Sequence, residues 1–88
     1  MDLQDYRKQI DEIDRQLTAL FQQRMDVAAA IADYKQTHDL PVLDAGREQE
    51  KRRSICAMVR EDLQDDADKL YSTIFELSRS YQNRRMGR

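Results

Sequence analysis

The sequence predicts an all-α fold of three helices, the first of them very long. The 88 residues include only two Gly and one Pro, so residues that favour turns are nearly absent. Apolar side chains recur at alternating spacings of three and four along the first segment, as in helices that pack on other helices. We therefore expect a single domain over residues 1–88, with helices at about 3–38, 45–60 and 67–84.

The first predicted helix carries an apolar seam with one interruption. The seam residues are Leu3, Tyr6, Ile10, Ile13, Leu17, Leu20, Val27, Ile31 and Tyr34. Arg24 stands where the repeat expects an aliphatic side chain. The helix would be roughly 54 Å long, whereas a compact chain of this size is only about 30 Å across. A second surface must cover the seam, and we expect a homodimer in which the long helices pack together.

The remaining two helices are separated by short polar segments. Pro41 ends the first helix, and Asp44 is placed to cap the second. Asp65 or Asp66 is placed to cap the third. The inward face is expected to contain Ile55, Cys56, Val59 and Leu63 on the second helix, and Leu70, Tyr71, Ile74, Phe75, Ser78, Tyr81 and Gln82 on the third.

Composition excludes several kinds of site. One Cys and one His leave no disulfide framework and little material for a metal site, so no metal is expected. No apolar run is long enough to span a membrane, and the N-terminus does not resemble a signal peptide, so we expect a cytoplasmic protein. A formal net charge of −2 argues against nucleic-acid binding.

Two cationic residues of the first helix point in one direction. Arg24 would lose the hydration of its guanidinium in the seam, which is unfavourable unless an anion pairs with it. It either binds a ligand, fixes the pairing of helices, or reaches an internal carboxylate. Lys35 follows eleven residues later, close to three turns, with the two Cα atoms about 16 Å apart. Together they would hold a small dianion, whereas the alternative for Lys35 is a solvated side chain near the helix end.

Polar pairs also occupy the other two helices. Arg47 and Glu48 lie in the first turn of the second helix, where a cation opposes the helix dipole. Arg47 therefore serves a ligand or makes a surface ion pair. Ser78 and Gln82 place a hydroxyl and an amide among apolar residues of the third helix. Because buried polar groups need partners, this pair belongs either to a helix–helix hydrogen-bond network or to a binding site.

Arg7 lies near the start of the first helix, about 25 Å along the axis from Arg24. One small ligand cannot touch both side chains within a single chain. In an antiparallel dimer, Arg7 of one chain would approach Arg24 and Lys35 of the other. The alternative is an exposed charge beside the seam.

Read in order, these residues resemble the all-α (AroQ-type) chorismate mutase family over nearly the full chain. The matching features are Arg7 with Ile10 and Asp14, Leu20 and Arg24 before Ala28-Ala29-Ala30, Lys35, Pro41-Val42, Asp44-x-x-Arg47-Glu48 and Ser78-x-x-x-Gln82. The resemblance implies an intertwined homodimeric helical bundle of three-helix chains, with two equivalent sites between the chains. This agrees with the dimer expected from the length of the first helix.

The resemblance also implies an activity, the pericyclic rearrangement of chorismate to prephenate in aromatic amino acid biosynthesis. Such a reaction uses no cofactor or metal; it needs a compact substrate conformation and a stabilised transition-state charge. By resemblance the catalytic residues are Lys35, Gln82, Arg24 and Glu48, and the substrate-binding residues are Arg7, Arg24, Lys35, Asp44, Arg47, Glu48, Ser78 and Gln82. Apolar walls are expected from Val27, Ile31 and Ile74.

The resemblance divides the polar residues by the part of the substrate that they would meet. Arg24 and the partner chain's Arg7 would bind carboxylates, Arg47 would meet the other carboxylate, and Ser78 would lie near one of them. The remaining roles concern the ether oxygen and the ring hydroxyl. The ether oxygen would be met by the donors Lys35 and Gln82, and the ring hydroxyl by Glu48 and the backbone N–H of Asp44.

Two other functions remain open on the sequence. Isochorismate pyruvate lyase shares the fold and a similar cationic site. The complete Asp44-x-x-Arg47-Glu48 motif favours the mutase, since Glu48 can accept a hydrogen bond from the chorismate hydroxyl. A non-catalytic helical dimerisation module would instead use the same charged residues structurally.

Overall fold

The computed structural model describes residues 1–88 and consists of helices joined by short connections. They are α1 (Leu3–Thr37), α2 (Ala45–Met58), a 3₁₀ turn η1 (Glu61–Leu63) and α3 (Gln64–Arg85). The expected all-α fold with a very long first helix is confirmed. None of the helices is long and apolar enough to cross a membrane.

Helix α1 begins and ends with local side-chain contacts. Asp2 accepts a hydrogen bond from the Asp5 backbone N–H, and the Asp5 carboxylate accepts from the Asp2 N–H, each at 3.0 Å, which forms a capping box. At the other end His38 stacks on Tyr34 with ring centroids 3.9 Å apart. Asp39 follows with a φ of 54°, a left-handed conformation that turns the chain away from the helix axis.

The start of α3 differs from the sequence expectation. Asp65 and Asp66 lie in its first turn and do not cap it; the N-cap is Leu63, which makes no side-chain cap bond. The 3₁₀ turn η1 runs directly into α3, so α3 begins three residues earlier than predicted. The expected cap of α2 is confirmed, because an Asp44 carboxylate oxygen accepts from the Arg47 backbone N–H at 3.0 Å.

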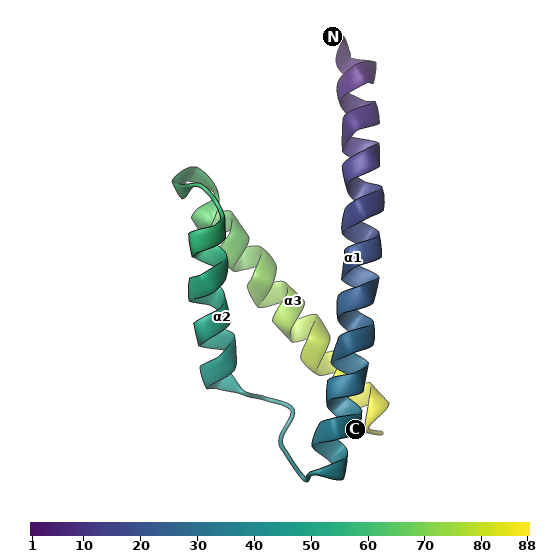
Figure 1. The fold of residues 1–88 in the computed structure, drawn as a ribbon, viewed down its shortest axis with the longest axis vertical. Coiled ribbons are helices and arrows are strands. Elements are labelled where there is room, and N and C mark those ends of the chain that lie inside the picture. The colour runs from purple at the N-terminus through teal and green to yellow at the C-terminus, as the bar shows by residue number, and fades with distance from the viewer.

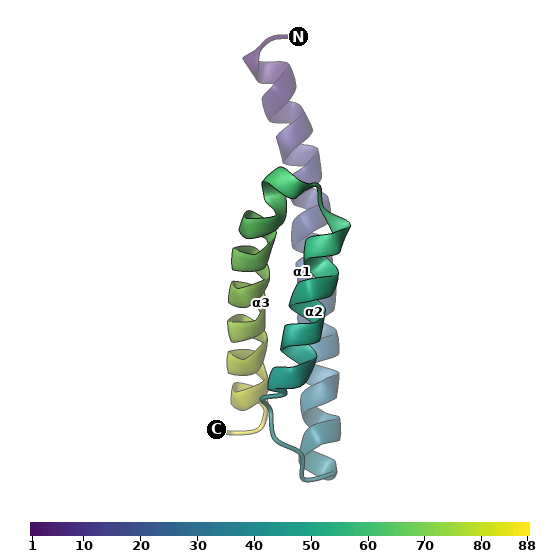
Figure 2. The same cartoon turned by 90° about the vertical axis from the view of Figure 1, so that its left-hand side faces the viewer.

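The three helices form an open arrangement rather than a closed bundle (Figure 1). Helix α3 packs against both α1 and α2, whereas α1 and α2 do not pack against each other. Figure 2 shows the N-terminal part of α1 extending past the other two helices without a neighbour. The chain measures 54 × 25 × 15 Å, and its radius of gyration of 16.1 Å exceeds the roughly 12 Å of a compact chain of this length.

Few side chains are buried within one chain. Only nine of the 88 residues are buried, and no large side chain is completely enclosed. Small residues dominate where α1 meets α3, because Ala28, Ala29 and Ala32 allow the helices to approach closely. Ala32 also packs with Val42 of the connecting loop and Met86 beyond α3, which fixes the loop against both helices. The cluster of buried residues that contact one another therefore lies at the C-terminal end of α1.

Candidate active site

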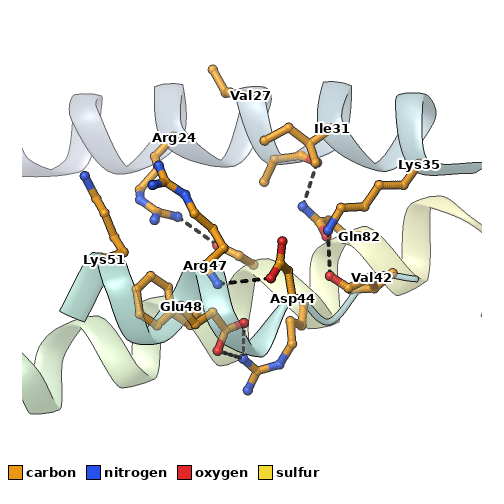
Figure 3. A pocket seen from close by; sticks show the side chains of 14 residues that line it. Arg24, Val27, Ile31, Lys35, Val42, Asp44, Arg47, Glu48, Lys51 and Gln82 are labelled. Carbon is orange, nitrogen blue, oxygen red and sulfur yellow. Dashed lines mark hydrogen bonds and ion pairs between the residues drawn. The ribbon is translucent and has the colours of Figure 1, made fainter. Parts of the chain in front are cut away.

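A cavity of about 450 Å³ opens between α1 and α2, with α3 closing one side (Figure 3). It exists because α1 and α2 are each held by α3 but do not touch. Its lining consists of Arg24, Val27, Ala28, Ile31, Lys35, Val42, Asp44, Arg47, Glu48, Lys51, Phe75, Ser78, Arg79 and Gln82. Seven of the eight sequence-predicted site residues are in this set. The lining is rich in cations and suits an anionic ligand of small size.

Side chains of α3 hold the guanidinium of Arg24 in place. Its Nη1 donates to the Ser78 hydroxyl at 3.0 Å, and its guanidinium lies 5.9 and 5.7 Å from the ring centroids of Tyr71 and Phe75. These contacts stabilise a partly desolvated cation through a hydrogen bond and cation–π attraction. No internal carboxylate meets Arg24, so that alternative is wrong. The other N–H groups of the guanidinium can bind an anion.

Lys35 is directed back toward the loop after α1. Its Nζ donates to the Val42 carbonyl at 2.7 Å, and the side chain is partly buried. Because Val42 is fixed by its contacts with Ala32 and Met86, the ammonium group has a defined position. This position rules out the alternative of a fully solvated lysine. Only one of the three ammonium hydrogens is used, which leaves donors for a ligand.

Gln82 and Ser78 are both buried in the wall formed by α3. The Gln82 Nε2 donates to the Ala28 carbonyl of α1 at 3.2 Å, and Ser78 bonds to Arg24 as described above. A helix–helix hydrogen-bond network is therefore present, as one of the two sequence interpretations expected. The same residues line the cavity, so the two interpretations are compatible. The second hydrogen on Gln82 Nε2 makes no hydrogen bond within the chain.

The first turn of α2 contributes Arg47 and Glu48. The Asp44 cap fixes this turn, and the side chain of Arg47 is exposed and 3.4 Å from Glu50. The surface ion pair considered for Arg47 is thus present, although a pair so exposed holds the side chain weakly. Glu48 is partly buried and paired with Arg79 of α3, whose Nη1 lies 2.5 Å from both carboxylate oxygens.

Sequence reasoning missed two cations of the lining, Lys51 and Arg79. Lys51 is three residues after Glu48 and four after Arg47, so helical spacing was the signal that could have placed it on the same face of α2. Arg79 lies between Ser78 and Gln82 in sequence, at the flank of the face that these two residues define. An arginine beside the inward face of a helix is usually solvated. The partner of Arg79 lies 31 positions away in sequence, and only the fold brings the two together.

The order of these residues along three helices matches one known family. The family model for chorismate mutase type II matches residues 6–83. The chain belongs to the chorismate mutase type II family. No curated protein and no solved structure matches it in the corresponding comparisons. The family expected from the sequence is confirmed over almost the whole chain.

Two residues expected at the chorismate mutase site lie outside the cavity of the single chain. Arg7 is exposed on the N-terminal part of α1 and does not line the cavity. Ile74, expected as a wall, is also absent from the lining, whereas its neighbour Phe75 lines the cavity. The walls expected from Val27 and Ile31 are present. Arg7 is therefore not part of the cavity that its own chain forms.

Proposed function

We propose that this chain is a chorismate mutase that converts chorismate to prephenate. The observation that carries the proposal is the cavity in which cations from all three helices, a buried amide and a carboxylate paired with Arg79 converge. Chorismate presents two carboxylates, an ether oxygen and a ring hydroxyl, so its polar groups complement that lining. In the rearrangement the ether C–O bond breaks as a C–C bond forms, and no nucleophile or proton transfer is required.

Positioning the substrate carboxylates falls to the arginines. Arg24 offers a guanidinium preset by Ser78 and two aromatic rings, which lowers the entropy lost when it binds a carboxylate. Arg47 is exposed at the mouth of the cavity and is free to leave its weak contact with Glu50. Bound in this way, the substrate is restricted to the compact conformation from which the new C–C bond can form.

Stabilisation of the breaking ether bond falls to Lys35 and Gln82. Negative charge grows on the ether oxygen as the C–O bond lengthens, and hydrogen-bond donors aimed at that oxygen lower the barrier. Each of the two residues keeps at least one unused N–H after its contact with a backbone carbonyl. Glu48, with the backbone N–H of Asp44, would meet the ring hydroxyl.

The proposal includes a homodimer with shared sites. Nine exposed apolar side chains follow the predicted seam of α1, namely Leu3, Tyr6, Ile10, Ile13, Leu17, Leu20, Val27, Ile31 and Tyr34, and Phe21 is exposed beside them. They follow one seam and would remain in water in a single chain, a contiguous apolar surface that favours association. Packing of two such helices in antiparallel orientation would bring Arg7 of the partner subunit toward Arg24 and Lys35, and so complete the cation set.

Isochorismate pyruvate lyase is the competing activity, and the fold accommodates both. Glu48 supports the mutase, because it is paired, partly buried and part of the cavity lining, where it can accept from a ring hydroxyl. The purified chain should be incubated with chorismate and, separately, with isochorismate, and the products identified. Prephenate from chorismate establishes the mutase; pyruvate from isochorismate without prephenate formation overturns it.

A non-catalytic dimerisation module is the second alternative, and it makes a different prediction. The same chain would then form the dimer but would not bind a dicarboxylate that mimics the transition state. Calorimetric titration with such an analogue decides this point. Saturable binding at one site per chain supports the enzyme, whereas a folded dimer that neither binds the analogue nor consumes chorismate contradicts it.

A further inference from the structure

The contact between Arg79 and Glu48 carries a further inference about the cavity. Arg79 reaches from α3 to α2, and its Nη1 lies 2.5 Å from both oxygens of Glu48. The two side chains are only 31% and 25% exposed. The Glu48 carboxylate makes no other hydrogen bond in the chain, so Arg79 alone sets its orientation.

Joining α2 to α3 does not by itself explain this ion pair. Arg52 and Asp68 already join the same helices through two hydrogen bonds of 2.8 and 2.7 Å. Neither residue of that pair lines the cavity, although Arg52 lies close enough to Glu48 for electrostatic attraction. Arg79 and Glu48, by contrast, both line the cavity. A second tie between these helices thus lies where a ligand would meet it.

The negative charge of the ligand explains why Glu48 is paired with a cation at this position. A substrate with two carboxylates would meet the Glu48 carboxylate inside a partly desolvated cavity, where repulsion between like charges is weakly screened. A guanidinium directly behind Glu48 offsets that repulsion. Arg79 also occupies one lone-pair direction on each oxygen and leaves others open, so the carboxylate can still accept a hydrogen bond from a hydroxyl.

We propose that Arg79 is a positioning residue that orients the Glu48 carboxylate and offsets its charge, so that the cavity accepts a dianion bearing a ring hydroxyl. This inference rests on the proposed function, because the dianion and the hydroxyl are those of chorismate. Arg79 acts through Glu48 and makes no contact with the reacting atoms. Its removal affects substrate affinity more than the chemical step.

A double-mutant cycle tests the proposal. The four chains are the wild type, Arg79→Gln, Glu48→Gln and the double variant, each assayed for kcat and KM with chorismate. Arg79→Gln leaves an unpaired carboxylate facing the dianion, and we expect KM to rise about tenfold or more with a smaller change in kcat. Adding Glu48→Gln removes that carboxylate charge, and we expect KM to fall back at least threefold from the single Arg79→Gln value.

Two control variants separate charge from structure. Arg84→Gln removes the same charge from an exposed position of α3 and should leave KM unchanged. Arg79→Lys keeps the charge and should hold KM within about threefold of wild type, since a point charge still offsets Glu48. If Arg79→Gln does not fold, Glu48→Gln is compared with the double variant. Because Arg79 acts through the Glu48 charge, we expect loss of the Arg79 charge to leave KM within threefold once Glu48 is neutral, and a larger rise in KM overturns the inference.

The outcomes distinguish this inference from the proposed function. Absence of prephenate with the wild-type chain overturns the proposed function, and the cycle is then read from the affinity for a dicarboxylate transition-state analogue. The inference is overturned if Arg79→Gln leaves KM and analogue affinity within threefold of wild type. It is equally overturned if the double variant binds no better than Arg79→Gln, since a purely structural tie would give no recovery.

Discussion

At the scale of single residues, the position of Lys35 yields the most direct prediction. Its Nζ is anchored on the Val42 carbonyl and keeps two hydrogens for a ligand. Lys35→Ala removes a donor to the oxygen on which charge develops, and we expect kcat to fall by about 10²–10³. Steady-state kinetics with chorismate measure this effect.

The matched control is Lys69→Ala, which removes a lysine from the exposed face of α3. It should leave kcat and KM unchanged. A Lys35→Ala chain that remains folded and within threefold of wild-type kcat would refute the role proposed for Lys35.

Gln82 makes a prediction about pH. A carboxamide does not titrate and can donate a hydrogen bond at any pH in this range. Wild-type kcat should therefore be nearly flat from pH 6 to 8. Gln82→Glu donates only when its carboxyl is protonated, so that variant should be active at acidic pH and lose activity as pH rises. A steep loss of wild-type activity between pH 6 and 8 would contradict the assignment.

Residue chemistry could be predicted from the sequence where a polar group interrupts an apolar pattern. Arg24, Ser78 and Gln82 stand on faces that should be apolar, and all three line the cavity. Arg79 gave no such signal, because an arginine beside the inward face of a helix is usually solvated. Its significance depends on Glu48, which is far away in sequence and near only after α2 and α3 have packed.

At the scale of elements, the contact between α2 and α3 depends on pH. The Arg52 guanidinium donates two hydrogen bonds to Asp68, which holds the pKa of that carboxyl below its ordinary value of 3.8. Since the native pKa is lowered, the stabilisation is present above pH 3.8 and is lost as pH falls through the native pKa. Asp68→Asn should therefore lower the Tm by a few degrees at pH 7 and make little difference near pH 2.

The control for this prediction is Asp62→Asn, which removes one member of a more exposed ion pair with Arg60. It should change the Tm less than Asp68→Asn does at pH 7, because solvent screens that pair more strongly. Thermal unfolding followed by circular dichroism makes both comparisons. An Asp68→Asn effect that persists unchanged at low pH would show that the contact acts other than through the carboxylate charge.

Helix boundaries were predictable to different degrees along the chain. Pro41 and the Asp44 cap placed the end of α1 and the start of α2 correctly, because each acts through local geometry. The start of α3 was predicted three residues late, since η1 supplies its first hydrogen bonds and no side-chain cap marks the junction. The residue at the N-cap of α3 is Leu63, which has no side-chain hydrogen-bond acceptor, so the sequence carries no capping signal at that boundary.

At the scale of the whole molecule, the proposed sharing of sites can be tested by complementation. Arg7→Ala and Arg24→Ala should each abolish activity while leaving the dimer intact, because neither removes the apolar seam. In a mixed dimer both defects fall in one site and the other site is complete. Random exchange of equal amounts should then restore about a quarter of wild-type activity. No recovery after proven subunit exchange would exclude sites of this composition.

The open shape of the chain has a thermodynamic consequence under the proposed dimer. With nine buried residues, one chain has little apolar burial of its own to offset the entropy of folding, and most would come from the partner. Folding and association then become one equilibrium governed by mass action, so the Tm should rise with protein concentration. Dilution would therefore unfold the protein rather than release active single chains, and activity per chain would vanish together with the helical signal.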